Sequence, residues 1–289
     1  MTDAELSNWG RWGLEDELGT LNFITDEVRA RAVAEATTGQ VISLATPLAP
    51  VPLGGAFGFT QYTMPPAVTQ TLTYTSAASS AFTDTLTIAV HHADSTHIDA
   101  LAHVNCDGKV YPGIPVEKAI AGGTVRQGSS TPFTKGVITR GVLLDLAPGG
   151  AVEPDLEVTA ADFEKAEQRA NVQVESGDAL LVRGGWTMSA KTASSLPVVT
   201  LDAIRWMADR EISLYSGDIG DKPPIVPGGS TVLHKVALGR LGIPLVDGPE
   251  LDELARTCQE LGRFSFLYVL GTIPVTGATG LPVNPLAIF

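Results

Sequence analysis

The alternation of hydrophobic and polar positions predicts short β-strands along much of the chain. Threonine alternates with larger side chains over residues 71–75, a pattern typical of a strand with one face in water. Other runs are continuously apolar, as expected of strands buried on both faces. We therefore expect strands within residues 41–48, 71–75, 85–90, 141–147, 178–186 and 264–275.

Amphipathic segments between these runs predict helices. Thr25, Thr159 and Thr200 each precede such a segment and can cap it, and Asp162 follows Thr159 at the spacing of a capping box. We expect Ser230 or Thr231 to cap a further helix that ends at Gly239 or Gly242, and Gly262 to end the last one. The predicted helices cover residues 26–36, 160–170, 201–210, 232–242 and 250–262.

This mixture of elements indicates an α/β protein with a mixed sheet. Strands and helices do not alternate strictly enough for a barrel of eight βα units. The sequence has no low-complexity segment, charge block, linker or solenoid repeat that would divide it. We therefore expect a single domain over residues 1–289.

Composition and charge narrow the classes of partner. The chain is 44% hydrophobic and 18% charged, and its formal net charge of −13 argues against nucleic acid and anionic membrane surfaces. Cys106 and Cys258 are too few for a disulfide framework or a structural zinc site. No signal peptide or membrane-spanning run is recognised, so we expect a cytoplasmic protein. The glycine runs lack nucleotide-binding spacing, so we expect no nucleotide cofactor.

Four of the five histidines lie within residues 91–103. If the chain is extended there, His97 and Asp99 face the same side, and a helical turn capped by Asp99 would bring His103 over them. Nitrogen and oxygen donors of this kind suit zinc, manganese or ferrous iron. Alternatively, His97 and Asp99 are hydrogen-bonded core residues. A bound metal would activate water, and His103 could then move protons.

The stretch THIDALAHVNCDGKVYPG, residues 96–113, resembles the metal-dependent cyclase family, whose hallmark is HxGTHxDxxxH and which includes bacterial kynurenine formamidases and isatin hydrolases. The similarity extends over nearly the whole chain and includes NWGRWGLEDELGTLNFIT, SGDIGDKPP and LGIPLVDGPELDELA. It implies the swivelling β/β/α fold. It also implies a homodimer or homotetramer in which the N-terminal segment, residues 1–24, contacts a neighbouring subunit.

The resemblance assigns roles to the clustered residues one by one. His97 and Asp99 match two expected ligands of Mn(II) or Zn(II), and His103 matches the last hallmark histidine, a general acid/base or a ligand of a second ion. The first hallmark histidine falls on Ala93 and the glycine on Ser95. We expect His92 to replace the missing ligand through a β-bulge, with His91 or Asp94 as weaker substitutes.

Further candidates lie elsewhere in the chain. His234 and Asp247 resemble a His/acid pair of the family and could bind a second metal or the substrate; alternatively, His234 lies on a helix face and Asp247 in a loop. Asp218 and Asp221 are in a loop where site residues are common, although both could be turn formers. Trp9 and Trp12 could line a pocket for a flat aromatic substrate or could simply pack.

Three functions are compatible with these features. The first is a metal-dependent hydrolase that opens a C–N bond in a small cyclic or aryl amide, of the isatin hydrolase or arylformamidase type. The second is a cyclase, dehydratase or isomerase of a polyketide-like or aromatic intermediate, which the altered residues at Ala93 and Ser95 favour. The third is a metal-free protein that binds a small molecule on the same fold. The first is our leading prediction.

Overall fold

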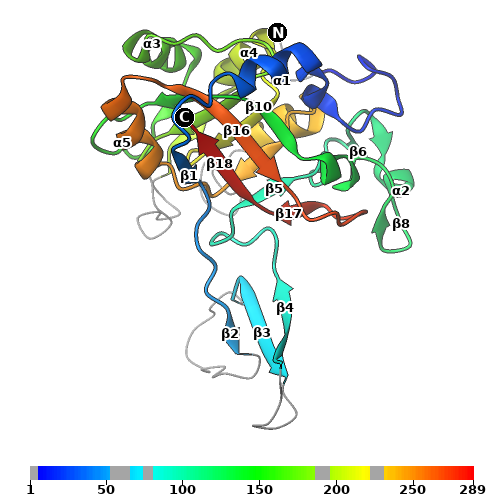
Figure 1. Ribbon diagram of the computed structural model, residues 1–289. Coiled ribbons are helices and arrows are strands. Elements are labelled where there is room, and N and C mark those ends of the chain that lie inside the picture. The colour runs from blue at the N-terminus through cyan, green and yellow to red at the C-terminus, as the bar shows by residue number, and fades with distance from the viewer. Residues whose placement is uncertain (1–5, 53–65, 74–80, 186–195, 222–230) are drawn as a thin grey trace.

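A nine-stranded mixed sheet forms the body of the protein (Figure 1). The computed structural model describes residues 6–52, 66–73, 81–185, 196–221 and 231–289. In spatial order, the strands are β1 (Val41–Ser43), β18 (Asn284–Ile288), β16 (Ser265–Gly271), β10 (Val137–Asp145), β12 (Ala179–Arg183), β14 (Leu214–Gly217), β15 (Leu245–Asp247), β5 (His97–Asp99) and β17 (Gly280–Pro282). The expected α/β class with a mixed sheet is confirmed.

The four central strands are parallel and buried on both faces. β10, β12, β14 and β15 run parallel to one another, and the remaining pairings are antiparallel. Their continuously apolar sequences fit this position, because alternate residues enter different cores. Val142 and Leu144 pack on one side of the sheet, whereas Leu143 packs on the other.

Helices cover both faces of the sheet. α3 (Ala160–Ala170), α4 (Leu201–Asp209) and η5 (Leu233–Leu241) supply the core on one face, and α5 (Asp252–Leu261) supplies it on the other. α1 (Asp26–Val33) packs beside β10. The predicted helices all form, and the caps at Thr25, Thr159 and Thr200 are confirmed. Gly242 and Gly262 end their helices in the left-handed conformation.

The start of η5 differs from the prediction. Neither Thr231 nor the residue before Leu233 caps it with a side chain, and Ser230 lies outside the described residues. Instead, the Asp221 carboxylate accepts the backbone N–H groups of Leu233 and His234, each at 2.9 Å. An aspartate from a preceding strand–loop segment therefore satisfies the first turn of this helix.

Short elements complete the body. They are η2 (Gly19–Phe23), η3 (Thr131–Lys135), α2 (Val116–Ala119), β6 (Lys109–Val110), β7 (Ile114–Pro115), β8 (Ile120–Ala121), β9 (Thr124–Val125), β11 (Glu157–Val158) and β13 (Val198–Val199). Among the described residues, no helix is both long and apolar enough to cross a membrane.

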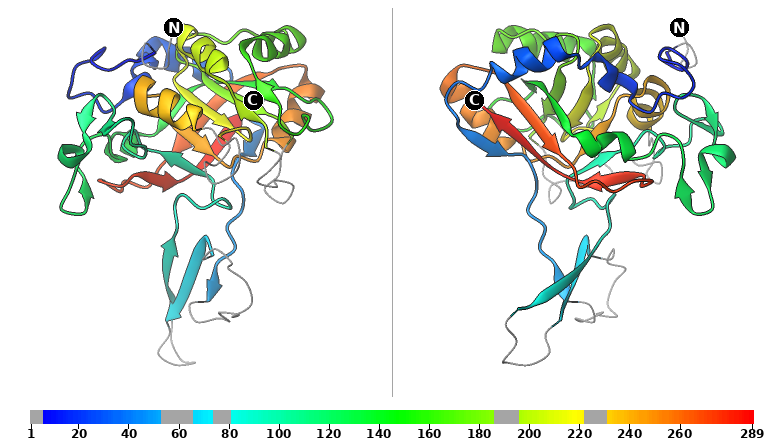
Figure 2. Two further views of the ribbon diagram at one scale, coloured as in Figure 1. Left: turned by 180° about the vertical axis from the view of Figure 1, so that it is seen from behind. Right: turned by 45° about the vertical axis from the view of Figure 1, so that its right-hand side comes forward.

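A small sheet projects from the body (Figures 1 and 2). It contains β2 (Val51–Pro52), β3 (Val68–Thr73) and β4 (Thr83–Ile88), and we call residues 66–73 and 81–88 of this projection the arm. The predicted strands at 71–75 and 85–90 correspond to β3 and β4, although residues 74–75 lie outside the described residues. The chain enters the arm from β1 and leaves it toward β5.

Candidate metal centre

β5 carries two residues of the histidine cluster into the body. It pairs with β15 on one side, where Asp247 lies opposite His97, and with β17 on the other, where Gly280 lies opposite Asp99. Because side chains two apart on a strand share a face, His97 and Asp99 meet: His97 Nε2 is 3.5 Å from Asp99 Oδ1. The predicted juxtaposition of these two residues is present.

His91 supplies the next imidazole, from the turn that follows β4. Its Nδ1 lies 2.9 Å from Asp99 Oδ1. The ring rests on the backbone of β17, where a Cβ built on Gly280 would be 2.7 Å from His91 Cε1. A glycine at 280 therefore leaves the space that this ring occupies.

His92, which we expected in the ligand set, points elsewhere. Its Nδ1 accepts a hydrogen bond from the backbone N–H of Asp94 at 3.0 Å, and the Asp94 side chain is 67% exposed. Residues 90–95 form turns instead of a bulged strand, so the expected β-bulge is absent. The turn presents His91 to Asp99, which corrects the placement expected for His92 from the sequence.

His103 reaches Asp99 through a turn. The backbone N–H of His103 donates to the Ala100 carbonyl at 2.8 Å, and no helix forms, so Asp99 is not a helix cap as predicted. His103 Nε2 lies 3.9 Å from Asp99 Oδ2. Its ring stacks on that of His91, with centroids 3.9 Å apart and planes 14° apart.

His234 and Asp247 complete the cluster from distant parts of the chain. His234 Nε2, on the first turn of η5, lies 3.5 Å from both Asp99 Oδ2 and Asp247 Oδ2. His234 Nδ1 lies 2.8 Å from Asp221 Oδ2. Asp247 ends β15, where the carboxyl ends of the parallel strands open toward the site. The structure thus joins His234 to the cluster and does not leave it on an isolated helix face.

Three imidazoles are fixed through their outer nitrogens. His97 Nδ1 lies 2.7 Å from the Ser95 carbonyl oxygen, His91 Nε2 lies 3.0 Å from Thr279 Oγ1, and His234 Nδ1 contacts Asp221. The carbonyl at Nδ1 of His97 and the carboxylate at Nδ1 of His234 hold a ring proton on that nitrogen. Nε2, which faces Asp99, can then offer its lone pair to a metal ion. Within the described part of the chain, no hydrogen bond holds the His103 ring in this way.

Asp99 lies at the centre of these donors. Its side chain is fully buried, the nearest donor is His91 Nδ1 at 2.9 Å from Oδ1, and neither carboxylate oxygen has a well-aligned hydrogen bond from the described residues. Burial alone would raise the pKa of Asp99, but the imidazoles of His234 and His91 hold it below its usual value. An ionised, buried carboxylate that faces only imidazole nitrogens is costly unless a cation balances it. The donor set therefore fits a divalent metal ion.

The pKa values of His234 and His103 are shifted in opposite directions. Burial would lower the pKa of His234, but Asp221, Asp247 and Asp99 raise it to about 12, so a metal ion that binds Nε2 would have to displace a proton from it. Burial lowers the pKa of His103 below its usual value, although Asp99 opposes this. His103 is therefore neutral and able to accept a proton at neutral pH.

Two ligand sets can be distinguished, and they share Asp99. We call His91, His97 and Asp99 the first set, and their donor atoms lie within 4.8 Å of one another. We call Asp99, His234 and the adjoining Asp247 the second set; the donor atoms of Asp99, His234 and His103 also lie within 4.8 Å of one another. Zinc and manganese both accept such nitrogen and oxygen donors.

The cluster opens into a pocket of about 400 Å³. Asp218 and Asp221 line it together with the cluster and the backbone of Gly217 and Gly220, so the predicted loop position of the two aspartates is at the site. Asp218 Oδ1 accepts the backbone N–H of Gly184 at 2.6 Å. This volume suits a small-molecule substrate.

Trp9 and Trp12, predicted as pocket residues, do not line this pocket. Trp9 donates from Nε1 to the Gly239 carbonyl at 2.9 Å, and Trp12 packs edge-on against Phe23 with ring centroids 5.2 Å apart. Both belong to an N-terminal segment packed on its own chain, where Asn8 also bonds the backbone of η5. The packing interpretation of these tryptophans is the one that the structure supports. Contact of this segment with a neighbouring subunit stays a prediction.

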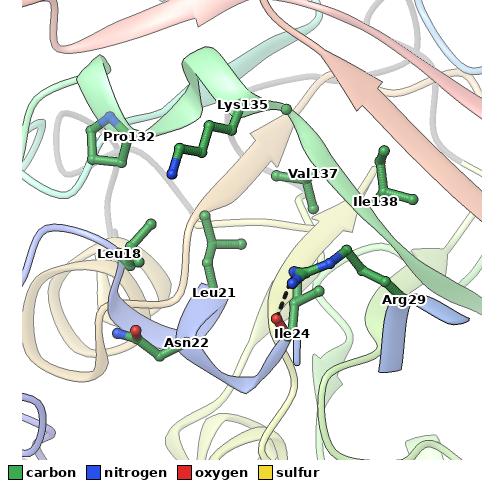
Figure 3. Close-up of a pocket in the computed structure, with 10 residues that line it drawn as sticks. Leu18, Leu21, Asn22, Ile24, Arg29, Pro132, Lys135, Val137 and Ile138 are labelled. Carbon is green, nitrogen blue, oxygen red and sulfur yellow. Dashed lines mark hydrogen bonds between the residues drawn. The ribbon is translucent and has the colours of Figure 1, made fainter. Parts of the chain in front are cut away.

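A separate pocket of about 440 Å³ lies between η2 and the start of β10 (Figure 3). Leu18, Leu21 and Val137 contribute aliphatic surface, and Lys135 and Arg29 are its charged residues. Arg29 donates to the Ile24 carbonyl at 2.8 Å. With no imidazole or carboxylate in its lining, this pocket lacks the donors that a metal site needs.

Comparison with known proteins agrees with the resemblance noted in the sequence. The family model described as "Putative cyclase" matches residues 42–220, a range that contains β5 and the turn of His91. A crystal structure of a novel cyclase matches with a TM-score of 0.83 and 25% identity, covering 100% of this chain and 99% of the other. No curated protein sequence matches the chain significantly.

Two isatin hydrolases share the fold at lower identity. Isatin hydrolase A from Labrenzia aggregata, bound to benzyl benzoate, has a TM-score of 0.60 and 17% identity, with 91% of this chain and 97% of that chain covered. An isatin hydrolase bound to the product analogue thioisatinate has a TM-score of 0.59 and 18% identity, with 90% and 95% covered. The sequence, the sheet and these relatives agree: the chain is an enzyme that belongs to the cyclase family.

Proposed function

We propose that this enzyme is a metal-dependent hydrolase of a C–N bond in a small cyclic or aryl amide. The observation that carries the proposal is Asp99, a buried carboxylate with no well-aligned hydrogen bond among the described residues, which is surrounded by the imidazoles of His91, His97, His103 and His234. The named isatin hydrolases with the same fold favour an amide or lactam substrate.

In this proposal, metal binding and proton transfer are carried out by different residues. His91, His97 and Asp99 would hold one divalent ion, Mn(II) or Zn(II), and Asp99, His234 and Asp247 would hold a second. A divalent ion bound there would polarise the substrate carbonyl and lower the pKa of a water molecule. The outer hydrogen bonds of His97 and His234 keep their Nε2 atoms directed at Asp99.

His103 carries the proton in this proposal. Its ring is not anchored by a hydrogen bond within the described residues, and burial keeps it neutral. His103 Nε2 accepts a proton from the attacking water as the new C–O bond forms, and then gives it to the leaving nitrogen as the C–N bond breaks. The water oxygen remains on the carbonyl carbon, which becomes a carboxylate. The nitrogen becomes an amine, which leaves as a second product from an acyclic amide and stays on the ring-opened product of a cyclic amide.

The experiment that tests this proposal combines metal analysis with activity. We expect purified protein to contain a divalent metal, and a chelator to abolish hydrolysis of isatin or N-formylkynurenine, with recovery on adding Mn(II) or Zn(II). His92→Ala is the matched control for metal binding, because His92 lines the same pocket but belongs to neither ligand set. A metal-free protein that stays inactive on both substrates after either ion is added contradicts the proposal.

A second candidate is ring formation, dehydration or isomerisation on a polyketide-like or aromatic intermediate. The specific observation in its favour is the novel cyclase structure, which has the highest TM-score among the relatives described above. The residues Ala93 and Ser95, which depart from the hallmark pattern, are also compatible with a changed reaction. Turnover of such a substrate that persists in chelator would favour this candidate over the hydrolase.

A further inference from the structure

The pocket between η2 and the start of β10 differs in charge from the chain as a whole (Figure 3). Acidic residues outnumber Lys and Arg by 32 to 19 in the sequence, yet the lining of this pocket contains Arg29 and Lys135 and no Asp or Glu. By contrast, carboxylates line the pocket of the metal centre, and Asp145 and Glu167 each line one of two other pockets. The lining of the pocket at η2 therefore favours an anion.

Lys135 is the cation of this lining that is available to a ligand. Arg29 donates to the Ile24 carbonyl and forms an ion pair with Asp26, so its charge is already balanced. The ammonium group of Lys135 has no hydrogen bond or ion pair with the described residues, and it points into the pocket toward Leu21 (Figure 3). An anionic group in the pocket can therefore accept a charge-assisted hydrogen bond from Lys135.

Most of the remaining lining is aliphatic. It consists largely of Leu18, Leu21, Ile24, Pro132, Val137 and Ile138. The volume of about 440 Å³ is in the range of small-molecule sites and is more than a simple inorganic anion would fill. A ligand that uses both features of the pocket has a negative group for the ammonium and an apolar body that covers the aliphatic side chains.

The two turns that form the walls are fixed by the body of the protein. In η3, Phe133 is buried and its carbonyl accepts a hydrogen bond from the Thr272 hydroxyl at 2.6 Å. In η2, the Asn22 side chain donates to the Gly19 carbonyl at 2.9 Å. The walls are thus held in place before a ligand binds, which lowers the conformational cost of binding.

We propose that this pocket is a binding site for a small organic carboxylate with an apolar body, that is, an aryl or short alkyl carboxylate. The carboxylate accepts from the Lys135 ammonium, and the hydrocarbon part covers Leu21 and Val137. A single negative charge matches the single ammonium group of the lining better than a phosphate group, which carries more charge at neutral pH. The inference goes beyond the proposed function and does not depend on it, because no residue of this pocket belongs to either ligand set.

Titration calorimetry of the full chain with benzoate tests the proposal. We expect a dissociation constant below about 1 mM, and Lys135→Met to raise it by about 10-fold or more, because the variant removes the charge and keeps the length of the side chain. Ile138→Glu adds a carboxylate to the same wall at an exposed position and should weaken binding by a similar factor. Lys118→Met removes an exposed lysine outside the pocket and is the matched control, with unchanged affinity.

Further titrations identify where the carboxylate binds and what it requires. Because a metal ion could also bind a carboxylate, we repeat the titration with Asp99→Asn, which should bind benzoate as the wild type does. Benzamide, the neutral analogue, and inorganic phosphate should each bind at least about 10-fold more weakly than benzoate. Circular dichroism melting checks that each variant is folded. The proposal is overturned if benzoate does not bind, if Lys135→Met binds it unchanged, if Asp99→Asn loses it, or if phosphate binds as tightly.

Discussion

The two ligand sets share Asp99 but are assembled in different ways. The first set comes from a single stretch of chain, a turn followed by β5, and its members are nine residues apart or less. The second set draws His234 from η5, and the adjoining Asp247 comes from the end of β15. The first set therefore depends on local turn geometry, whereas the second depends on the order of strands in the sheet.

The support behind each set differs as well. His97 and His91 are held by a backbone carbonyl and a threonine hydroxyl, which are neutral. His234 is held by the Asp221 carboxylate, which also binds the first turn of η5. A charged partner makes the His234 imidazole more basic than a neutral one would. We therefore expect effects of different size and kind from variants of four residues: Asp99, His103, His91 and Asp221.

Asp99→Asn should have the largest effect. It removes the one carboxylate common to both sets, so we expect loss of all bound metal and a fall in kcat/KM of about 10⁴-fold or more, equivalent to several kcal/mol. The side chain keeps its size, so the fold should survive. Metal content by mass spectrometry and the circular dichroism spectrum check the two statements, and a variant that retains both metal and activity would refute a shared ligand.

His103→Asn should lower activity while leaving metal in place. Removal of a general acid/base typically costs 10²- to 10⁴-fold, and we expect about 10³-fold here, mainly in kcat. The measurement is kcat with metal content determined on the same sample. If this variant instead loses metal as completely as Asp99→Asn does, His103 is a ligand of the second set and not the proton carrier.

The sequence predicted the first set better than the second, for a physical reason. The two-residue period of an extended chain brings His97 and Asp99 together wherever β5 lies in the fold. The choice between His91 and His92 depends on backbone angles in residues 90–95, where a change of one residue swaps the side chain that faces Asp99. Periodicity carries no information on such a turn, so our expectation of His92 was wrong about its direction.

His91→Ala sharpens this distinction when it is paired with His92→Ala. Loss of the His91 imidazole removes one donor of the first set, and we expect its metal affinity to fall by about 100-fold, with a smaller loss from the second set. His92→Ala removes only a turn hydrogen bond and should cost about 0.5–1.5 kcal/mol of stability with metal affinity unchanged. Isothermal titration with Mn(II) measures both. The reverse ranking of the two variants would restore His92 as the ligand.

The fold, like the site, could be predicted from the sequence where local patterns are strong, but not where it depends on the pairing of distant segments. Strong local patterns located β1, β10, β12 and β16 of the sheet and the capped helices, for example α3 with its Thr159–Asp162 box. The three-residue strand β15 was not located, because so short a run has no measurable period, and β5 was expected only as an extended stretch at His97 and Asp99. Their antiparallel pairing is what places Asp247 opposite His97. The part of the site that depends on this pairing could be suggested only by the family resemblance.

Asp221→Asn should have the smallest effect of the four and should be confined to the second set. The single amide oxygen can accept from Leu233 or from His234 but not from both, and it carries no negative charge to support the His234 imidazole as the carboxylate does. Hydrogen-bond partners of metal-bound histidines typically change the metal affinity by 10- to 100-fold. We therefore expect the affinity for one of the two metal ions to fall by about that factor.

Asp218, a second aspartate in the same pocket, provides the control for a general disturbance of the site. Asp218 lines the pocket too, but its Oδ1 accepts from the Gly184 backbone N–H and it belongs to neither ligand set. Asp218→Asn should therefore leave both metal equivalents in place, although it can alter substrate affinity. Titration with Co(II), followed by its visible absorption, resolves the two sites. Equal loss at both sites in Asp221→Asn would mean that the two sets are not independently supported, and the contrast between them would fail.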